Sequence, residues 1–234
     1  MVKSDNSTPY LAADYDSQVR STIPYYEAFH EETINLIRAM RFDPNSWLDT
    51  GCGTGTLAQR LLTAFPKTQF VLVDPAAEML NKAKVKLSNN VGRVKFLEPA
   101  DTQDLPKGLG RFDVITAIQS HHYINREERN KATSVCFELL KPAGVYITFE
   151  NIRPLTSKGT AIGKENWKNF QLAKGRETAE VQKHLERFDV EYHPVTIEEH
   201  LSLLRDTGFA TVEMLWYSYM QAGFYAIKKE GHSQ

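Results

Sequence analysis

Hydrophobic residues along this chain form two kinds of pattern that alternate. Short segments rich in apolar residues predict strands at 45–49, 69–74, 93–98, 112–118 and 145–150. The segment 69–74 is a continuous apolar run, of the kind that a parallel sheet buries on both faces. Between these segments, apolar residues recur at helical spacing and predict helices over 55–65, 76–87 and 126–140. Strands that alternate with helices in this way indicate an α/β fold with a mostly parallel sheet.

Both ends of the chain extend this alternating core. Before the first strand, residues 10–41 form a helical leader that breaks at Pro24 and continues as an amphipathic helix. Near the C-terminus, Thr196 and Glu199 have the spacing of a capping box that begins a last helix. Two further strands follow closely enough to form an antiparallel hairpin, at 211–220 and 223–228.

The segment at 151–194 is polar and has helical patterns at 165–172 and 178–188. It is too long for a simple connection, so we expect an insertion that covers the site. Its alternating charges are also typical of a solvated helix face. We therefore interpret residues 1–234 as one domain with four parts: the leader 10–41, a core 45–150, the helical cap 151–194, and a terminal part 195–228.

The most specific motif is Trp-Leu-Asp-Thr-Gly-Cys-Gly-Thr-Gly-Thr-Leu-Ala at 47–58, where the first strand ends and the next helix begins. Gly51, Gly53 and Gly55 alternate, and glycine allows a tight turn and a close approach of the backbone to a ligand. The dinucleotide fingerprint requires a glycine where Thr56 stands. By itself this glycine loop is either a ligand-binding loop or a structural turn.

An acidic residue ends the second predicted strand. Asp74 lies where α/β nucleotide sites place the carboxylate that binds the ribose hydroxyls. The structural alternative is that Asp74, followed by Pro75, caps the next helix. The glycine loop upstream favours the ribose role.

The glycine loop, with Asp49 before it and Asp74 after the next strand, resembles the nucleotide-binding motif of class I S-adenosylmethionine-dependent methyltransferases. The run Leu-Leu-Lys-Pro-Ala-Gly-Val-Tyr-Ile-Thr-Phe-Glu at 139–150 is similar to the family's segment before and within strand five, and the terminal hairpin is similar to the family's last strands. The resemblance implies a seven-stranded, mostly parallel sheet with an antiparallel last strand and helices on both faces. It also implies an N-terminal helical lid and S-adenosyl-L-methionine as cofactor.

The resemblance further implies which residues bind the cofactor. Met79 is expected beside the adenine ring, with a core methionine as the alternative, and Asp101 is expected to take the adenine amino group, with Asp104 as the alternative. Tyr26 or Arg20 of the leader is expected to reach the methionine carboxylate, although both residues fit a surface helix packed on the core. The complete expected set is Arg20, Tyr26, Asp49, Gly51, Cys52, Gly53, Gly55, Asp74, Pro75, Met79, Asp101, Thr102 and Gln119.

Three residues just after the strand 112–118 are the catalytic candidates: His121, His122 and Tyr123. They follow the carboxyl end of a strand, where open α/β sheets bind ligands. Adjacent histidine side chains usually point apart, so the pair predicts no metal site. Ordering of the loop is the structural alternative for the histidines, and Glu150 is a further candidate base.

Composition excludes several other classes of function. Lys plus Arg number 28 and Asp plus Glu 29, so no overall positive field recruits nucleic acid or an anionic membrane. Cys52 and Cys136 are the two cysteines, which supports neither a disulfide framework nor a cysteine zinc site. Residues 1–9 lack the apolar core of a signal peptide, and no run is long enough to span a bilayer. We expect a cytoplasmic protein.

The predicted function is in-line methyl transfer from S-adenosyl-L-methionine to a small-molecule acceptor, which depends mainly on positioning. Residues 119–122 replace the Asn-Pro-Pro-Tyr type of tetrapeptide that, in relatives, accompanies methylation of nucleic acids or glutamine. Two alternatives stay open: an enzyme of the same fold that transfers a different group, and a non-catalytic module that binds the cofactor. The oligomeric state is unknown from the sequence.

Overall fold

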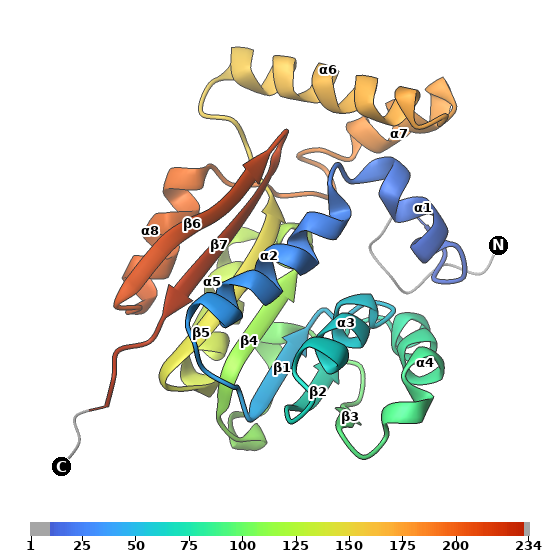
Figure 1. Ribbon diagram of the computed structural model, residues 1–234. Coiled ribbons are helices and arrows are strands. Elements are labelled where there is room, and N and C mark those ends of the chain that lie inside the picture. The colour runs from blue at the N-terminus through green and yellow to red at the C-terminus, as the bar shows by residue number, and fades with distance from the viewer. Residues whose placement is uncertain (1–9, 232–234) are drawn as a thin grey trace.

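A seven-stranded sheet of order β3-β2-β1-β4-β5-β7-β6 forms the centre of the computed structural model, which describes residues 10–231 (Figure 1). Strands β1 to β5 pair in parallel, and β7 is antiparallel to both β5 and β6. This confirms the predicted fold class, including the antiparallel last strand. The strands are β1 Ser46–Thr50, β2 Gln69–Val73, β3 Val94–Phe96, β4 Phe112–Ile118, β5 Leu140–Asn151, β6 Thr211–Ser218 and β7 Gln221–Ile227.

Helices cover both faces of the sheet, as the apolar patterns predict. One face packs against α2, α3 and α4 through a core that includes Phe29, Leu61 and Leu80. The other face packs against α5 and α8 through Cys136 and Leu204. The helices are α1 Tyr15–Thr22, α2 Tyr26–Ala39, α3 Thr56–Ala64, α4 Ala77–Lys86, α5 Arg126–Leu139, α6 Ser157–Ala173, α7 Thr178–Glu186 and α8 Ile197–Thr207.

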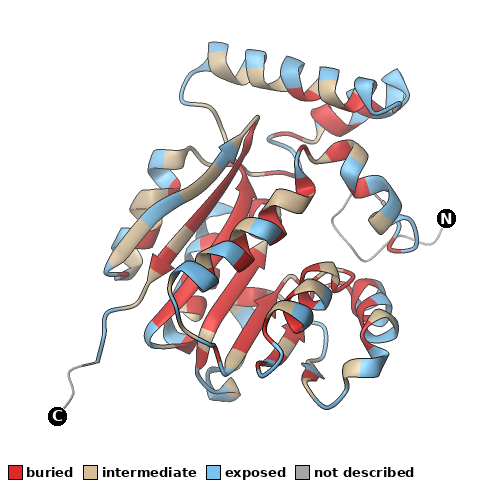
Figure 2. Ribbon diagram, in the orientation of Figure 1, coloured by how far each residue is buried: buried red, intermediate tan, exposed pale blue. Residues whose placement is uncertain are grey.

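Local sequence signals place several of these elements accurately. The capping box at the start of α8 is present, because the Thr196 side chain accepts from Glu199 N and the Glu199 side chain accepts from Thr196 N. Gly208 ends the helix at φ 107, a left-handed conformation that glycine adopts without steric strain. Burial follows the position of each strand in the sheet. The central strands are buried, whereas the edge strand β6 is half exposed (Figure 2).

Strand β5 begins earlier than predicted. We expected a helix that ends at residue 140 and a strand at 145–150, but β5 begins at Leu140, immediately after α5 ends. Leu140 pairs with Phe112, and the register then shifts between Phe112 and Val114. Ala143 has φ 58 in this interval. The segment is therefore an irregular part of the strand, because residues on both sides of it, Leu140 and Val145, pair with β4.

Helices α6 and α7 of the insertion lie together with α1 of the leader beyond the carboxyl ends of the strands, at the top and upper right of Figure 1, whereas α2 lies across a face of the sheet. Helix α6 is longer than the predicted 165–172, because the Thr156 side chain accepts from Gly159 N and starts the helix at Ser157. Trp167 of α6 donates its indole N–H to the carbonyl oxygen of Thr22 at 2.6 Å. The insertion thus holds the end of α1 in place.

Two expectations from the sequence concern membrane spans and a signal peptide. No helix within residues 10–231 is long and apolar enough to cross a membrane. Residues 1–9, on which the expectation of a missing signal peptide depends, lie outside the described range.

Replacement of the Trp167 indole by a ring without the N–H donor tests the contact between the insertion and α1. We expect Trp167→Phe to remove one hydrogen bond, worth about 1 kcal/mol. Amide hydrogen exchange across α1 should then become faster by roughly fivefold, as measured by mass spectrometry. Trp216→Phe, which changes an aromatic contact with Phe29, is the control and should leave exchange in α1 unchanged. Equal protection of α1 in the Trp167 variant would contradict this assignment.

Candidate functional site

Three adjoining cavities lie at the carboxyl ends of the parallel strands. The loop cavity borders the glycine loop with Tyr26, His30 and Asp49. The strand-end cavity borders Asp74, Pro75, Met79, Asp101 and Tyr123. The lid cavity lies under α1, α6 and α7 and borders Tyr123, Asn151, Trp167, His184 and Tyr192. Tyr15 and Gln119 line all three, so the cavities adjoin one another. Their volumes are about 30 Å³ for the loop cavity, 120 Å³ for the strand-end cavity and 20 Å³ for the lid cavity.

Two glycines of the glycine loop are required for different reasons. Gly51 has φ 72, and a Cβ there would lie 2.5 Å from the Cβ of Ser120. Gly53 has φ 54, and no atom of the described residues lies within 4 Å of the position of its Cβ. Gly53 instead lines both the loop cavity and the strand-end cavity. Packing within the protein therefore requires Gly51, whereas Gly53 leaves space open beside the cavities.

Asp74 connects the glycine loop to the start of α4. The carboxylate is 7% exposed, and it accepts from Gly53 N at 2.8 Å and from Ala76 N at 2.9 Å. The alternative expectation, Asp74 as the N-cap of the next helix with Pro75 in its first turn, is wrong, because α4 begins at Ala77 and its N-cap residue is Ala76. Asp74 also lines the strand-end cavity, so the ribose role stays a prediction.

Asp49, at the end of β1, has one oxygen that lacks a partner. Oδ1 accepts from the Thr116 hydroxyl at 2.7 Å, while Oδ2 is buried with no hydrogen-bond partner among the described residues. Burial raises the pKa of this carboxyl to about 7, despite the hydrogen bond from Thr116. Because Asp49 lines the loop cavity, the free oxygen is a natural partner for a cationic group of a ligand.

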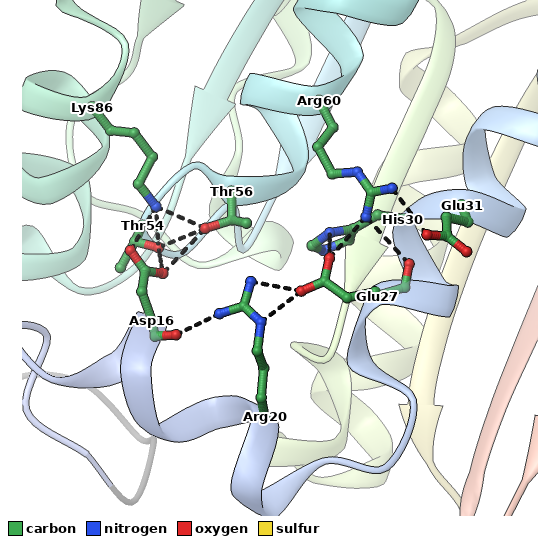
Figure 3. Close-up of polar contacts among 9 residues, drawn as sticks. All are labelled: Asp16, Arg20, Glu27, His30, Glu31, Thr54, Thr56, Arg60 and Lys86. Carbon is green, nitrogen blue, oxygen red and sulfur yellow. Dashed lines mark hydrogen bonds and ion pairs between the residues drawn. The ribbon is translucent and has the colours of Figure 1, made fainter.

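A polar contact fastens α1 to the glycine loop (Figure 3). Asp16 of α1 accepts from Lys86 Nζ at 2.7 Å and from the Thr54 and Thr56 hydroxyls at 2.6 and 3.1 Å. Burial acts against ionisation of Asp16, but these hydrogen bonds and the charge of Lys86 lower its pKa. We call Asp16, Thr54, Thr56 and Lys86 the α1 anchor. It holds Tyr15 against the cavities.

Arg20 lies outside the loop cavity. Its guanidinium donates to Glu27 Oε1 at 2.7 Å and to the backbone oxygen of Asp16 at 2.6 Å, and it lies 5.6 Å from the centre of the Tyr26 ring. Arg60 of α3 binds Glu27 from the other side at 2.8 Å (Figure 3). Tyr26 lines the loop cavity, and Arg20 does not. A contact of Tyr26 or Arg20 with the methionine carboxylate stays a prediction.

Gln119 takes a backbone conformation that non-glycine residues rarely adopt. Its φ is 55, and its N–H donates to the carbonyl of Phe149 at 2.7 Å. The side chain donates to Gln221 Oε1 at 2.8 Å, and Gln221 in turn donates to Asn151. This chain of amides connects the ends of β4, β7 and β5, and it fixes Gln119 where all three cavities meet.

The two histidines after β4 are held behind the cavities. Glu150 accepts from the backbone N–H of His121 and of His122, from His122 Nδ1 at 2.8 Å, and from the Thr148 hydroxyl. Burial opposes ionisation, yet the hydrogen bond and charge of His122 lower the pKa of Glu150 to about 2. His121 places Nε2 3.0 Å from the Thr102 hydroxyl and Nδ1 3.2 Å from the Tyr146 hydroxyl. These contacts order the segment that follows β4, which is the structural alternative expected for the histidines. Neither histidine lines any of the three cavities.

Some of the other expected residues line the cavities, and the rest pack against residues outside the cavities. Tyr123 lines the strand-end and lid cavities, and burial raises its pKa above the usual value. Asp101 lines the strand-end cavity, and burial followed by the charge of Asp104 raises its pKa. Thr102 is buried against Thr50 and His121. Cys52 lines the loop cavity, and Gly55 packs against Ala83 at 3.1 Å from its Cβ position.

Comparisons with known proteins agree with this arrangement. A family described as "Methyltransferase domain" matches residues 48–144. The carboxy-S-adenosyl-L-methionine synthase of Trichodesmium erythraeum is 24% identical over 92% of this chain and 85% of its own length. Among solved structures, the chain is similar to an O-methyltransferase family protein from Burkholderia thailandensis, with a TM-score of 0.66, 18% identity and coverage of 94% of this chain. The chain spans 60% of the length of that protein.

A further solved structure matches over most of both chains. The plantazolicin methyltransferase BpumL, in complex with a triazolic substrate analogue and S-adenosylhomocysteine, has a TM-score of 0.69 at 14% identity. The match covers 94% of this chain and 90% of that one. Residues 48–144 thus match a methyltransferase domain, and the fold of the chain is that of class I S-adenosylmethionine-dependent methyltransferases. S-adenosyl-L-methionine is its cofactor.

The residues at the loop and strand-end cavities fit this cofactor. The free Oδ2 of Asp49 suits the ammonium group of its amino-acid part, because a buried carboxylate without a partner is stabilised by a cation. The open space at the Cβ position of Gly53 leaves the backbone accessible to a ligand. Asp74 and Asp101 add acceptors at the other end of the site.

Sequence reasoning missed several residues of the site. The α1 anchor joins Asp16 to Lys86, which are far apart in the chain, and no short motif indicates that pairing. His30 lines the loop cavity, and His184, Trp167 and Tyr192 line the lid cavity. The signal available for the last three was their aromatic or imidazole character within an otherwise polar insertion.

The unpaired oxygen of Asp49 predicts a pH dependence of cofactor binding. A pKa of about 7 means that the carboxyl is half protonated near neutral pH. Pairing with the ammonium requires the ionised form, so affinity for S-adenosylhomocysteine should rise as the pH increases from 6 to 8, by roughly tenfold. Calorimetry across this range measures it. In Asp49→Asn the affinity should be lower and nearly independent of pH, and retention of the wild-type pH profile would contradict the assignment.

The same carboxyl has the opposite effect on the free protein. Its pKa is higher in the folded chain than in the unfolded chain, so its contribution to stability is lost as the pH rises from about 4 to above 7. At pH 8, Asp49→Asn should therefore increase the free energy of unfolding, by at most about 4 kcal/mol at about 1.4 kcal/mol per pKa unit. Denaturant unfolding at pH 8 and at pH 5 measures the difference, which should shrink at the lower pH.

Removal of the Lys86 charge tests the α1 anchor. Lys86→Met keeps the aliphatic stem and leaves the Asp16 carboxylate bound only by the two threonine hydroxyls. We expect S-adenosylhomocysteine to bind about two- to fivefold more weakly, because Asp16 is half exposed and such pairs contribute up to about 1 kcal/mol. Lys131→Met removes a comparable pair with Glu127 on the surface of α5 and should have no effect. Equal affinities of the two variants would show that the anchor does not support the site.

Proposed function

We propose that this protein transfers the methyl group of S-adenosyl-L-methionine to a small-molecule acceptor bound in the lid cavity. The observation that supports the proposal is the position of the lid cavity. It adjoins the strand-end cavity at Tyr15, Gln119 and Tyr123, and helices of the leader and the insertion enclose it. An enclosed site of this kind suits a small acceptor better than a nucleic acid or a protein surface.

Positioning is the main contribution expected from the chain. The cofactor supplies a methyl group that its sulfonium already activates, so the enzyme must hold donor and acceptor in line. Such positioning can contribute on the order of 7–11 kcal/mol. Asp74 and Gln119 are fixed by hydrogen bonds to the glycine loop and to Gln221, which supports a rigid site.

Tyr123 is the catalytic candidate from the sequence that best fits this proposal. It lines the two cavities that would contain donor and acceptor, whereas both ring nitrogens of His121 and Nδ1 of His122 form hydrogen bonds behind the site. Burial keeps the phenol of Tyr123 protonated by raising its pKa, so Tyr123 suits orientation of the acceptor by a hydrogen bond. We retain the proposal of a cytoplasmic protein without a nucleic-acid partner, which the near balance of 28 basic and 29 acidic residues supports.

A second candidate function has specific support from the comparisons. The relatives named carboxy-S-adenosyl-L-methionine synthase match over most of this chain, and the same activity here would make the cofactor itself the acceptor of a carboxyl group. A co-substrate that carries a carboxylate favours a cationic side chain beside the cofactor. Lys and Arg are absent from the residues that line the lid cavity within the described chain, and this favours methyl transfer.

The fate of a labelled methyl group separates the candidates. We expect the protein, incubated with S-adenosyl-L-methionine labelled at the methyl carbon and a panel of uncharged phenols and nitrogen heterocycles, to form S-adenosylhomocysteine and a labelled, methylated product in equal amounts. Mass spectrometry measures both. Gly53→Val should abolish turnover, because its side chain would occupy the space that Gly53 leaves open.

Two results would contradict methyl transfer. Label that remains in a cofactor derivative heavier by one carboxyl group would establish the second candidate. Binding of S-adenosylhomocysteine without any product, across the panel and with carboxylate co-substrates, would indicate a non-catalytic module.

A further inference from the structure

The lid cavity has walls of aromatic rings. Its volume of about 20 Å³ holds about one water molecule, so a larger ligand requires the helices around it to move apart. Tyr15 of α1, Tyr123 after β4, Trp167 of α6 and Tyr192 after α7 all line it. Tyr123 and Tyr192 meet edge to face, with ring centres 5.4 Å apart. Aromatic walls from four separate segments favour a ligand that presents a flat apolar face to each of them.

Formal charge is lacking from the same walls. The polar groups that line the cavity are neutral amides, hydroxyls and one imidazole, and neither Asp, Glu, Lys nor Arg is among the lining residues in the described chain. A charged ligand would leave water without an opposite charge to compensate it. The lining therefore favours an acceptor without formal charge.

The imidazole of His184 has a nitrogen that no described residue binds. His184 lies on α7, is 4% exposed and lines the lid cavity. Its Nδ1 lies 3.4 Å from the Tyr192 hydroxyl, whereas Nε2 is buried without a hydrogen-bond partner among the described residues. A buried polar nitrogen of this kind is unfavourable unless a ligand or water satisfies it.

Neighbouring contacts favour one position of the proton on His184. Arg187 donates to the Tyr192 oxygen at 2.6 Å, which favours donation of the Tyr192 proton to Nδ1 of His184, 3.4 Å away. In a neutral imidazole whose Nδ1 accepts, Nε2 carries the hydrogen. Donation from Arg187 also polarises the chain of hydrogen bonds towards His184.

We propose that His184 binds the acceptor by donating a hydrogen bond from Nε2, and that the acceptor is an uncharged planar molecule with an oxygen or ring nitrogen that accepts this bond. The proposal rests on the small-molecule methyl transfer proposed above and specifies its acceptor. The four aromatic walls hold the flat faces of the molecule, and His184 fixes its orientation towards the strand-end cavity. His184 would thus determine specificity, whichever atom receives the methyl group.

The charges behind the cavity agree with a neutral His184. Burial, with Arg176 and Arg187 nearby, lowers the pKa of His184 to about 3. Arg187 binds Glu191 at 2.6 Å, and Arg176 lies 3.8 Å from Glu180, so each arginine has its own counter-ion. The imidazole therefore acts as a neutral donor in the neutral pH range.

Binding of three planar probes of matched shape tests the proposal without any need for turnover. Acetophenone has a carbonyl oxygen, α-methylstyrene replaces that oxygen by a methylene group, and benzoate has a negative charge. The full chain saturated with S-adenosylhomocysteine should bind acetophenone about tenfold more tightly than either of the others, because a hydrogen bond and the absence of charge both favour it. Titrations followed by nuclear magnetic resonance measure the three dissociation constants.

Three variants assign the preference to His184. His184→Phe keeps a flat ring and should abolish the preference for acetophenone over α-methylstyrene, whereas His184→Gln, which retains a donor, should keep part of it. Tyr192→Phe removes the hydroxyl that orients the imidazole and should reduce the preference. His200→Phe is the matched control, because His200 is also buried without partners for its ring nitrogens among the described residues but stacks on Phe224 away from the cavities.

Nitrogen-15 spectra of the imidazole ring provide an independent readout. The wild-type protein should have the hydrogen of His184 on Nε2, and that signal should shift when acetophenone binds. A hydrogen on Nδ1, equal binding of all three probes, tightest binding of benzoate, or no binding of any probe would each overturn the proposal. If the labelled methyl group is nevertheless transferred to some acceptor, the proposed function survives and only the role of His184 is lost.

Discussion

Parallel pairing of β1 with both β2 and β4 determines where the polar groups of this site lie. Because parallel strands all end at the same edge of a sheet, Asp49, Asp74 and Gln119 emerge side by side from three neighbouring strands. The glycine loop then fits between β1 and α3 only because Gly51 has no Cβ to collide with Ser120. Any change in the register of these strands would separate the cofactor-binding groups from one another.

The fold and the cofactor end of the site could be predicted from sequence because their signals are local. Continuous apolar runs indicate buried parallel strands, and the capping box of α8 lies within four consecutive residues. The acceptor end could not be predicted in the same way. It depends on contacts such as Trp167 with Thr22 and Asp16 with Lys86, which join parts of the chain that no short pattern relates. The histidines after β4 are a further example. Only the structure shows that Glu150 forms hydrogen bonds with the backbone N–H and with the ring of His122.

The two ends of the site use polar groups differently. At the cofactor end, carboxyl groups line the cavities. Oδ2 of Asp49 has no hydrogen-bond partner among the described residues, which leaves it available to a cation. Around the lid cavity, Arg176 and Arg187 are paired with Glu180 and Glu191, and only uncharged side chains among the described residues line the cavity. This division suits an enzyme in which a constant cationic cofactor meets a second molecule of different polarity.

Helix α1 is held at both of its ends, by the α1 anchor near Asp16 and by Trp167 at Thr22. Next to the first of these attachments, Tyr15 borders the loop cavity, the strand-end cavity and the lid cavity together. Under the proposed function, displacement of this one helix would open the donor space and the acceptor space at the same time, which couples entry of the substrate to exchange of the cofactor.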